Sequence, residues 1–587
     1  MVHSATAPWA FGGVSFNTSI GWNCPRFSAF ADGVGPRRSF VTVDAFDKGK
    51  KARALIVRHK KTKDWAPFNN AIEEEPITLF KAHFDVKLID QDFDYGHVCD
   101  FYNPDLVIYT TPGGNRPVPL KITNIRARQD IPRVGFTILD PHDTSRVLLL
   151  QQMDELLIDR FFACNVATLR QSPELAGRGF VLPLYFNSKI FRDYQLEKII
   201  PVSVFGGMMS PGFYKWRAEQ GREIFNHIPT LFYTHPGYES PILAHRYPIA
   251  GEDYAKMINR SHFSLSDANR LDYIVRKHLE IPGSGTILIS PNTPEVAAYG
   301  FVDMENCVLG SGKELLEKIA YVAANPDVYL KICRSGHDLV HSRYTLEHWT
   351  GIADWYACHK SLRSGETVQQ QGAFGPFVAV PQRENVSALH GELHGNDLTV
   401  LMETALENIL RGENFKETEE SLLSVLDWVG HIGEPWVPLG LVQLLRGDLS
   451  KAISLFSMAY IIREKRDTIS DLDPEEVAWL SLAGAMAGNQ ALLDMTRGKS
   501  AEMRHVSIRR MQWLGVVLAS GGDASSPPDD VLARMPGDRL SIHWLGQVDL
   551  KDWLGLVDRV LTANGRGEVL KKLPDFCVRE KSSLSPQ

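Results

Sequence analysis

Residues 276–290, RKHLEIPGSGTILIS, pass from a charged segment through two glycines into a short apolar run. The run TILIS at 286–290 is rich in β-branched residues and shows no polar alternation, which is typical of a strand buried on both faces. The charged segment before it has the composition of a helix that ends at a glycine-rich turn. A helix followed by a buried strand is the building unit of an α/β protein.

The same alternation of short apolar runs and longer helical segments extends in both directions from this stretch. Near-continuous apolar strands separated by helices indicate parallel sheets that are covered on both faces. We therefore predict two Rossmann-like parallel-sheet domains, at residues 49–195 and 196–360, each of ordinary domain size. The expected strands are residues 52–58, 84–90, 104–111, 131–140, 159–168 and 180–187 in the first domain and 201–207, 229–235, 261–267, 285–290 and 305–311 in the second.

The flanking segments differ in composition from these domains. Residues 1–48 and the last residues, 576–587, have no sustained period and are predicted to be a flexible leader and a tail. Residues 361–396 are rich in Gln, Gly, Pro and Ser and are predicted to be a linker. Residues 397–575 show an almost wholly helical sequence pattern, so we predict an all-α domain there.

One segment of the helical domain carries a repeat pattern. LRGEN at 410–414 recurs as LRGDL at 445–449. The residues around the second copy have the spacing of a tetratricopeptide unit, with aromatic and small side chains at its helix contacts; they are Trp436, Leu439, Gly440, Ala452, Phe456 and Ala459. We predict divergent repeats whose concave surface recognises an acceptor or a protein partner.

Composition limits the classes of function. The 587 residues carry a formal charge of −7, which disfavours an electrostatic nucleic-acid binder. The sequence has no apolar run of the roughly 20 residues that a membrane span needs, and its start lacks a signal-peptide pattern. Seven scattered cysteines without a C-x-x-C motif fit reduced thiols. We expect a protein of the cytoplasm or of a membrane periphery, with no transmembrane segment and no nucleic-acid partner.

The residues that directly follow strands deserve inspection, because parallel sheets bind ligands at the carboxyl ends of their strands. The segment 204–217, VFGGMMSPGFYKWR, places Gly206 and Gly207 after a strand and Lys215 and Arg217 shortly afterwards. Glycines let the backbone approach a ligand, and a cationic pair can neutralise a diphosphate. A tight turn before a solvated helix is the alternative. No G-x-G-x-x-G or Walker motif supports a nicotinamide or P-loop site.

Two carboxylates precede the strand 285–290. Asp272 and Glu280 are eight positions apart, so on a continuous helix they would lie near one face. Glu280 comes directly before the turn that contains Gly285, whose backbone could face a phosphate or a sugar. On spacing alone, an exposed acidic residue before a turn is the competing interpretation.

The first domain offers a further group after one of its strands. The segment LDPHD at 139–143 places Asp140 and His142 at the expected cleft, where a histidine could shuttle protons. An Asx turn that begins the next helix is the alternative. The acidic run 90–97 lacks the glycine and the distal glutamate of a calcium loop, so we predict no metal site.

The segment DYIVRKHLEIPGSGTILIS at 272–290, together with the sequence up to residue 350, resembles the glycosyl transferases group 1 domain of GT-B glycosyltransferases, in the spore-maturation-protein CgeB-like branch. The resemblance implies that Glu280 holds the ribose hydroxyls of a nucleotide sugar and that Asp272, where the family usually has glutamate, faces the transferred sugar. It also implies that Arg217, with Lys215, balances the diphosphate. Arg276 and Lys277 fall near the arginine that precedes the family's glutamate.

The resemblance further implies a reaction. A hexosyltransferase of this kind moves a sugar from a nucleotide-sugar donor to a glycan, glycolipid or protein acceptor, as in the synthesis of cell-envelope polysaccharide. It needs no metal or other cofactor and retains the anomeric configuration. Two alternatives stay open: a GT-B scaffold that has lost activity and acts through its helical repeats, and a relative of another reaction class such as a nucleotide-sugar epimerase.

Overall fold

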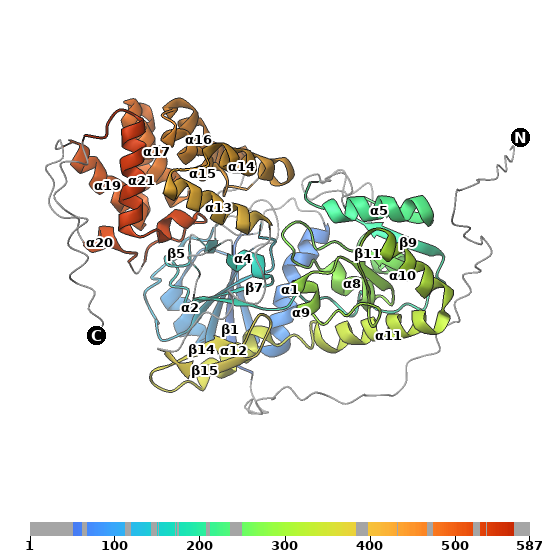
Figure 1. Ribbon diagram of the computed structural model, residues 1–587. Helices are drawn as coiled ribbons and strands as arrows, with labels where there is room; N and C mark the ends of the chain where they lie inside the picture. The colour runs from blue at the N-terminus through green and yellow to red at the C-terminus, as the bar shows by residue number, and fades with distance from the viewer. Residues whose placement is uncertain are drawn as a thin grey trace, which may run out of the picture.

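The computed structural model describes residues 51–60, 67–111, 119–141, 149–150, 152–170, 172, 175, 177–206, 212–234, 249–382, 397–430, 432–465, 473–519, 529–535 and 537–568. It shows two parallel sheets side by side and a helical region that lies over the first of them (Figure 1). The expected leader and tail lie outside the described residues.

The first domain is a six-stranded sheet in which all neighbours are parallel. Side chains of residues 53–58, the second strand from the edge, alternate between two cores: Ala54 and Ile56 pack with α1 (Pro67–His83), whereas Leu55 and Val57 pack with α2 (Tyr95–Tyr102). Burial on both faces explains the continuous apolar runs of the sequence. In spatial order the strands are β2 (Asp85–Ile89), β1 (Arg53–Arg58), β4 (Leu106–Thr110), β6 (Arg133–Thr137), β7 (Arg160–Ala163) and β8 (Gly179–Val181).

The second domain is a five-stranded parallel sheet that is also covered on both faces. Its strands, in spatial order, are β10 (Thr230–Tyr233), β9 (Ile200–Phe205), β11 (Ser261–Leu265), β12 (Ile287–Ser290) and β13 (Val308–Leu309). One face packs against α5 (Lys215–His227), α10 (Gly312–Ala324) and α11 (Pro326–Arg343), and the other against α7 (Gly251–Asn259) and α8 (Lys277–Gly283). Every strand expected from the sequence is present, so the prediction of two Rossmann-like domains is confirmed.

The predicted boundary between the second domain (196–360) and the linker (361–396) is wrong. The helix α12 (Gly351–Lys360) packs on the first domain, where the ring centroids of Trp355 and Phe162 lie 5.4 Å apart. Part of the predicted linker then forms a hairpin, β14 (Glu366–Gln370) with β15 (Phe377–Pro381). The side-chain amide of Gln370 accepts a hydrogen bond from the N–H of Val181 (3.0 Å) and donates one to its carbonyl (2.7 Å), which satisfies the free edge of β8.

The region from residue 397 onward is helical, as expected. Gly440 lies where a Cβ atom would come within 2.3 Å of the Phe456 ring, so the small residue lets α15 (Trp436–Leu445) and α16 (Leu449–Lys465) approach closely. The remaining helices are α13 (Asp397–Arg411), α14 (Phe415–Val429), α17 (Pro474–Ala487), α18 (Gln490–Glu502), α19 (Val506–Ala519), α20 (Asp529–Leu532) and α21 (Leu550–Ala563).

The last described helix of this region packs against its first helices. The helix α21 packs against α13 and α15, and the amide of Asn564 donates a 2.8 Å hydrogen bond to the carbonyl of Leu444. The tetratricopeptide character of the helices stays a prediction. In the described part of the chain, no helix is long and apolar enough to cross a membrane.

A cluster of buried charges joins α17 to the segment before α21. Asp473 caps α17 and accepts a 2.7 Å hydrogen bond from Ser541 Oγ, and Nε2 of His543 lies 3.4 Å from Glu476 Oε1. All four side chains are buried. Burial raises the pKa of Asp473. Burial alone would lower the pKa of His543, but the hydrogen bond to Glu476 and the charge of Asp473 raise it above its usual value.

This cluster predicts that the helical region loses stability as the pH rises from 6 to 9. A histidine whose pKa is raised by folding stabilises the fold below its unfolded pKa of about 6.5, and this contribution is lost as the pH rises through the folded value. The raised pKa of Asp473 also lowers stability as the pH rises, beginning above its unfolded value of about 3.8. Urea unfolding should therefore show a lower midpoint at pH 9 than at pH 6. His543→Gln should flatten this dependence and the exposed His97→Gln should not; a midpoint that rises with pH would contradict the prediction.

Candidate functional site

The carboxyl ends of the two sheets meet at the domain junction. Nη1 of Arg276, from the second domain, lies 2.6 Å from Glu75 Oε2 on α1 of the first. The Tyr273 hydroxyl, also from the second domain, hydrogen-bonds the Asp140 carboxylate, which follows β6. Residues that follow β1 and β6 of the first sheet and β11 of the second therefore meet at one site.

Arg217 is a fixed, buried cation at this site. It lies in the first turn of α5, is 2% exposed, and donates its backbone N–H to Asp267 Oδ2 (3.0 Å). Its guanidinium carbon lies 4.0 Å from the centre of the Tyr214 ring, a cation–π contact. A Cβ atom on Gly206 (φ +125°) would lie 2.5 Å from Arg217 Nη1, so the turn after β9 needs glycine. Among the described residues, Nε of Arg217 has no hydrogen-bond partner.

Lys277 brings a second cation to the same place. A Cβ atom on Gly206 would lie 3.9 Å from Lys277 Cε. Burial and the positive charge of Arg217 lower the pKa of Lys277 to about 8, although Glu280 and Asp140 act in the opposite direction. Two neighbouring cations raise each other's energy unless an anion lies between them. The arrangement around Gly206 therefore favours an anionic ligand.

Glu280 is buried rather than exposed, so the interpretation as a solvated charge before a turn is wrong. It is 7% exposed, and its Oε1 lies 3.5 Å from Nε of Arg276. Burial raises the pKa of Glu280, against the charges of Arg276 and Lys277. Arg276 thus lies between Glu280 and Glu75 and ties α8 to the first domain.

The expectation that Asp272 shares a helix with Glu280 is also wrong. The helix α8 begins at Lys277 and continues through Pro282 and Gly283. Asp272 is exposed and lies in a turn with φ 55°, a conformation that aspartate tolerates better than most residues. The turn keeps the neighbouring side chains of Leu271 and Tyr273 in the core. The charge of Asp272 acts on Glu295, at the start of α9 (Pro294–Ala298).

Asp140 reaches the second domain, as its place after a strand suggested. Burial raises its pKa to about 6, and the hydrogen bond from Tyr273 and the charge of Lys277 limit the rise. A carboxylate with a pKa near neutrality, in the field of the Lys277 cation, is suited to accept a proton.

The other predicted residues either lie away from the site or are not among the described residues. His142 and Gly207 are outside the described residues. The Lys215 side chain is 55% exposed and lies 3.9 Å from Glu219, one turn further along α5. Gly285 precedes β12 and so lies at the amino edge of the sheet, where its carbonyl accepts a 2.6 Å hydrogen bond from Lys198. The structure does not bring Lys215 or Gly285 to the site.

His278 positions α8 and was not singled out from the sequence. Its Nε2 lies 2.9 Å from Ser290 Oγ and its Nδ1 3.2 Å from Ser266 Oγ, at the ends of β12 and β11. Burial lowers its pKa to about 3, so the ring is neutral and can take part in both contacts. A serine at the carboxyl end of each of two neighbouring strands and a histidine on the intervening helix were the available signals.

Two Rossmann-like domains that face each other across a charged site, followed by a helical region, define an α/β protein of the GT-B type. Residues 200–353, the second domain and the start of α12, match the family model described as glycosyl transferase-like. The chain thus contains a glycosyltransferase-like domain. Its place in the CgeB-like branch stays a prediction.

Among curated proteins, none matches the chain. Similar solved structures include sucrose-phosphate synthase from Thermosynechococcus elongatus, with 11% identity over 52% of this chain and 98% of that one, and a TM-score of 0.36. HepE from Anabaena, in complex with UDP and glucose, has 11% identity over 52% and 99%, with a TM-score of 0.34. A glycosyltransferase from Rickettsia africae has 12% identity over 52% and 98%, with a TM-score of 0.36.

Proposed function

We propose that this protein is a glycosyltransferase that moves a sugar from a nucleoside-diphosphate sugar to a glycan, glycolipid or protein acceptor. The observation that carries the proposal is the convergence of Arg217 and Lys277 on Gly206, at the carboxyl ends of the strands. Cleavage of a sugar–phosphate bond leaves negative charge on the departing diphosphate, and fixed cations stabilise that charge. The match of residues 200–353 to a glycosyl transferase-like family supports the same reaction.

In this proposal each charged residue has a role. Arg217 and Lys277 bind the diphosphate, and Glu280, held by Arg276, accepts hydrogen bonds from the ribose hydroxyls. Asp140 takes the proton of the acceptor hydroxyl while that hydroxyl attacks the anomeric carbon from the same face that the diphosphate leaves. The bond from sugar to phosphate breaks as the glycosidic bond forms, and the anomeric configuration is retained. Metal independence, retention of configuration, a hexose as the transferred sugar and a cytoplasmic or membrane-peripheral location belong to the proposal through the family resemblance.

Thermal-shift measurements with UDP, GDP, ADP, CMP and their sugars test the binding step. A ligand at a hundred times its Kd stabilises the folded state by about 2.7 kcal/mol, so a true donor nucleotide should raise the melting temperature by several degrees. Glu280→Ala should abolish the shift, whereas Arg222→Met, an exposed position on the same helix as Arg217, should keep it. No shift with any of these compounds would sink the enzyme proposal.

The alternative, a scaffold that has lost activity, is favoured by the exposed position of Asp272. A scaffold that retained the cation pair would bind nucleotides without consuming them. Hydrolysis of the stabilising nucleotide sugar separates the two functions: slow release of free sugar, lost in Glu280→Ala, supports the transferase. Binding without hydrolysis or transfer supports the scaffold.

The two shifted pKa values predict a bell-shaped pH profile for kcat/KM. Activity should rise with pH near 6 as Asp140 loses its proton and becomes a base, and it should fall near 8 as Lys277 loses its charge. Lys277→Arg keeps the charge at high pH and should move the alkaline limb upward by more than one pH unit. An alkaline limb that stays in place in Lys277→Arg would remove Lys277 from the diphosphate site.

A further inference from the structure

The helical region packs on the two segments that lead to the residues of the donor site. Trp428, near the end of α14, lies against the segment that leads into α5: its ring is stacked on Phe213 with centroids 6.3 Å apart. A Cβ atom on Gly212 would lie 2.4 Å from Trp428 Cβ, so only glycine allows this approach. The guanidinium of Arg270, in the segment after β11, lies 5.0 Å from the centre of the Trp428 ring. One tryptophan therefore touches both segments that carry the site.

These two segments are also joined to each other and to the charged residues. The N–H of Arg270 donates a 3.1 Å hydrogen bond to the carbonyl of Phe213. Tyr214, next to Phe213, stacks on the Arg217 guanidinium, and Tyr273, three residues after Arg270, hydrogen-bonds Asp140. A displacement of Trp428 would therefore also move Tyr214, which contacts Arg217, and Tyr273, which contacts Asp140.

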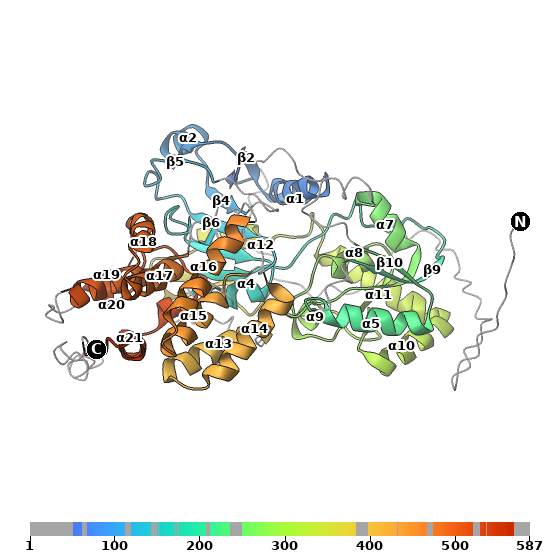
Figure 2. The same cartoon turned by 90° about the horizontal axis from the view of Figure 1, so that it is seen from above.

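A buried apolar core holds this junction together. It combines Ala167 of the first domain and three residues of the second with the inner faces of α13 and α14. Its members from the second domain are Phe213, Leu271 and Tyr273, and those from the helices include Leu398, Met402, Leu422, Val425 and Trp428. Figure 2 shows α14 extending from the helical region toward the second domain, in agreement with this core.

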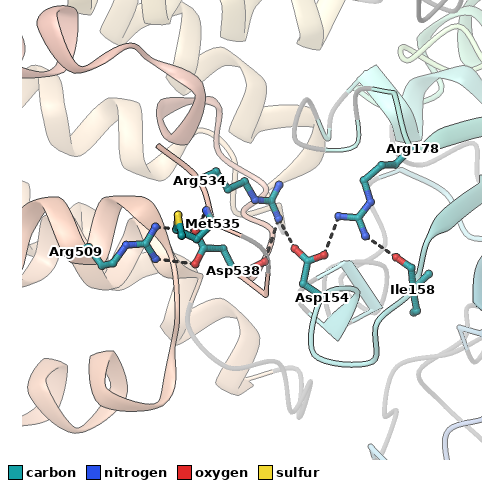
Figure 3. A network of polar contacts seen from close by, with 7 residues as sticks. All are labelled: Asp154, Ile158, Arg178, Arg509, Arg534, Met535 and Asp538. Atoms are coloured by element: carbon teal, nitrogen blue, oxygen red, sulfur yellow. Dashed lines mark hydrogen bonds and ion pairs between the residues drawn. The ribbon is translucent and has the colours of Figure 1, made fainter. Parts of the chain in front are cut away.

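A second contact fixes the helical region to the first domain. Asp154 accepts ion pairs from Arg534 (2.6 Å) of the helical region and from Arg178 (2.8 Å) of its own domain (Figure 3). Asp538 lies 2.6 Å from Arg509 and accepts a hydrogen bond from the N–H of Met535, next to Arg534. Arg539 of the same segment lies 2.6 Å from Glu155. The helical region is therefore anchored on the first domain while Trp428 bears on the second.

From these contacts we infer that the helical region is a structural part of the donor site, and that Trp428 is a positioning residue that sets the placement of Arg217 and Tyr273. The inference rests on the proposed function and extends it: the nucleotide is bound by the second domain only when α14 is in place. Trp428 itself touches neither the diphosphate nor the sugar in this scheme.

The test compares two tryptophan substitutions. Trp428→Ala should raise the Kd of the nucleoside diphosphate that binds the wild-type chain (UDP, GDP or ADP, by calorimetry) about 10-fold, a change of about 1.4 kcal/mol. Trp428→Phe keeps the stacking and should stay within about 3-fold of wild type, since an aromatic ring still fills the junction. Trp513→Ala removes a half-buried tryptophan of the same region, away from the junction, and serves as the matched control for lost packing.

The outcomes test the positioning role of Trp428 separately from the proposed glycosyltransferase function. A larger Kd in Trp428→Ala than in Trp513→Ala, at comparable loss of melting temperature, supports the positioning role. Equal Kd values in Trp428→Ala, Trp513→Ala and wild type overturn it and leave the glycosyltransferase proposal intact. A wild-type chain that binds none of the three nucleotides overturns the proposed function itself.

Discussion

Arg217→Met should raise the Kd of the donor nucleotide by at least about 100-fold. Methionine keeps the apolar stem that packs in the first turn of α5 and removes the guanidinium. A hydrogen bond to a charged group contributes about 1.5–3 kcal/mol, so the loss of a bidentate contact to a diphosphate costs about two factors of ten or more. Calorimetric titration of the purified variant with the nucleotide that stabilises the wild-type chain measures this effect.

Two variants keep this prediction open to contradiction. Arg217→Lys retains a positive charge but not the planar fork, so it should recover part of the affinity and no more. Arg222→Met removes an exposed arginine from the same helix and should bind as wild type does. Since Arg217 is buried, a melting curve must show that Arg217→Met folds. A folded variant with a Kd within about 3-fold of wild type would contradict the role of Arg217.

The inner strands were predictable because each is a short apolar run whose side chains are buried on both faces of its sheet. A run such as TILIS at 286–290 allows little else than a strand buried on both faces, and β12 occupies it. The hairpin β14–β15 was missed because its residues alternate weakly and one of its main contacts is a polar one, from Gln370 to the edge of β8. That contact joins residues far apart in the sequence, which no local pattern reports.

The site was predictable to the extent that its residues are neighbours in sequence. Arg276, Lys277 and Glu280 lie within five residues at the start of α8, and the structure keeps them together. Glu75 comes from the other domain, where nothing in its surroundings marks it. The prediction that Asp272 and Glu280 share a helix face was wrong, because an offset of eight positions gives a shared face only if the helix is continuous. Here the chain turns at Asn269 and Asp272, both with positive φ, before the helix begins.

The helical region packs more closely on the sheet domains than its sequence suggested. The repeat pattern suggested an appended recognition module, whereas its α14 packs on the segments that hold Tyr214 and Tyr273. Tertiary packing between domains of this kind depends on surface shape, and Gly212, whose missing side chain admits Trp428, gave no signal that separated it from an ordinary turn glycine.

Asp140→Asn should lower kcat by about 1,000-fold and leave the Kd of the donor nucleotide within about 3-fold of wild type. Asparagine is isosteric, can still accept the hydrogen bond of Tyr273, and cannot take up the acceptor's proton; general-base catalysis contributes about 100- to 10,000-fold. Once an acceptor is found, transfer is measured at saturating donor. Asp272→Asn, which preserves the turn because asparagine also tolerates positive φ, tests the other carboxylate that the sequence suggested.

Tyr273→Phe gives an independent reading of the same base. The Tyr273 hydroxyl lowers the pKa of Asp140 from the higher value that burial alone would produce, so removing the hydroxyl should raise that pKa above about 6. Because the base acts only when ionised, the acidic limb of kcat/KM should then move to higher pH, while the phenyl ring still packs against Leu271 and α14. A residue with a purely structural role would change the size of kcat/KM and leave the limb in place. An unmoved limb, or an Asp140→Asn variant that retains most of its kcat, would therefore show that the proton leaves by another route.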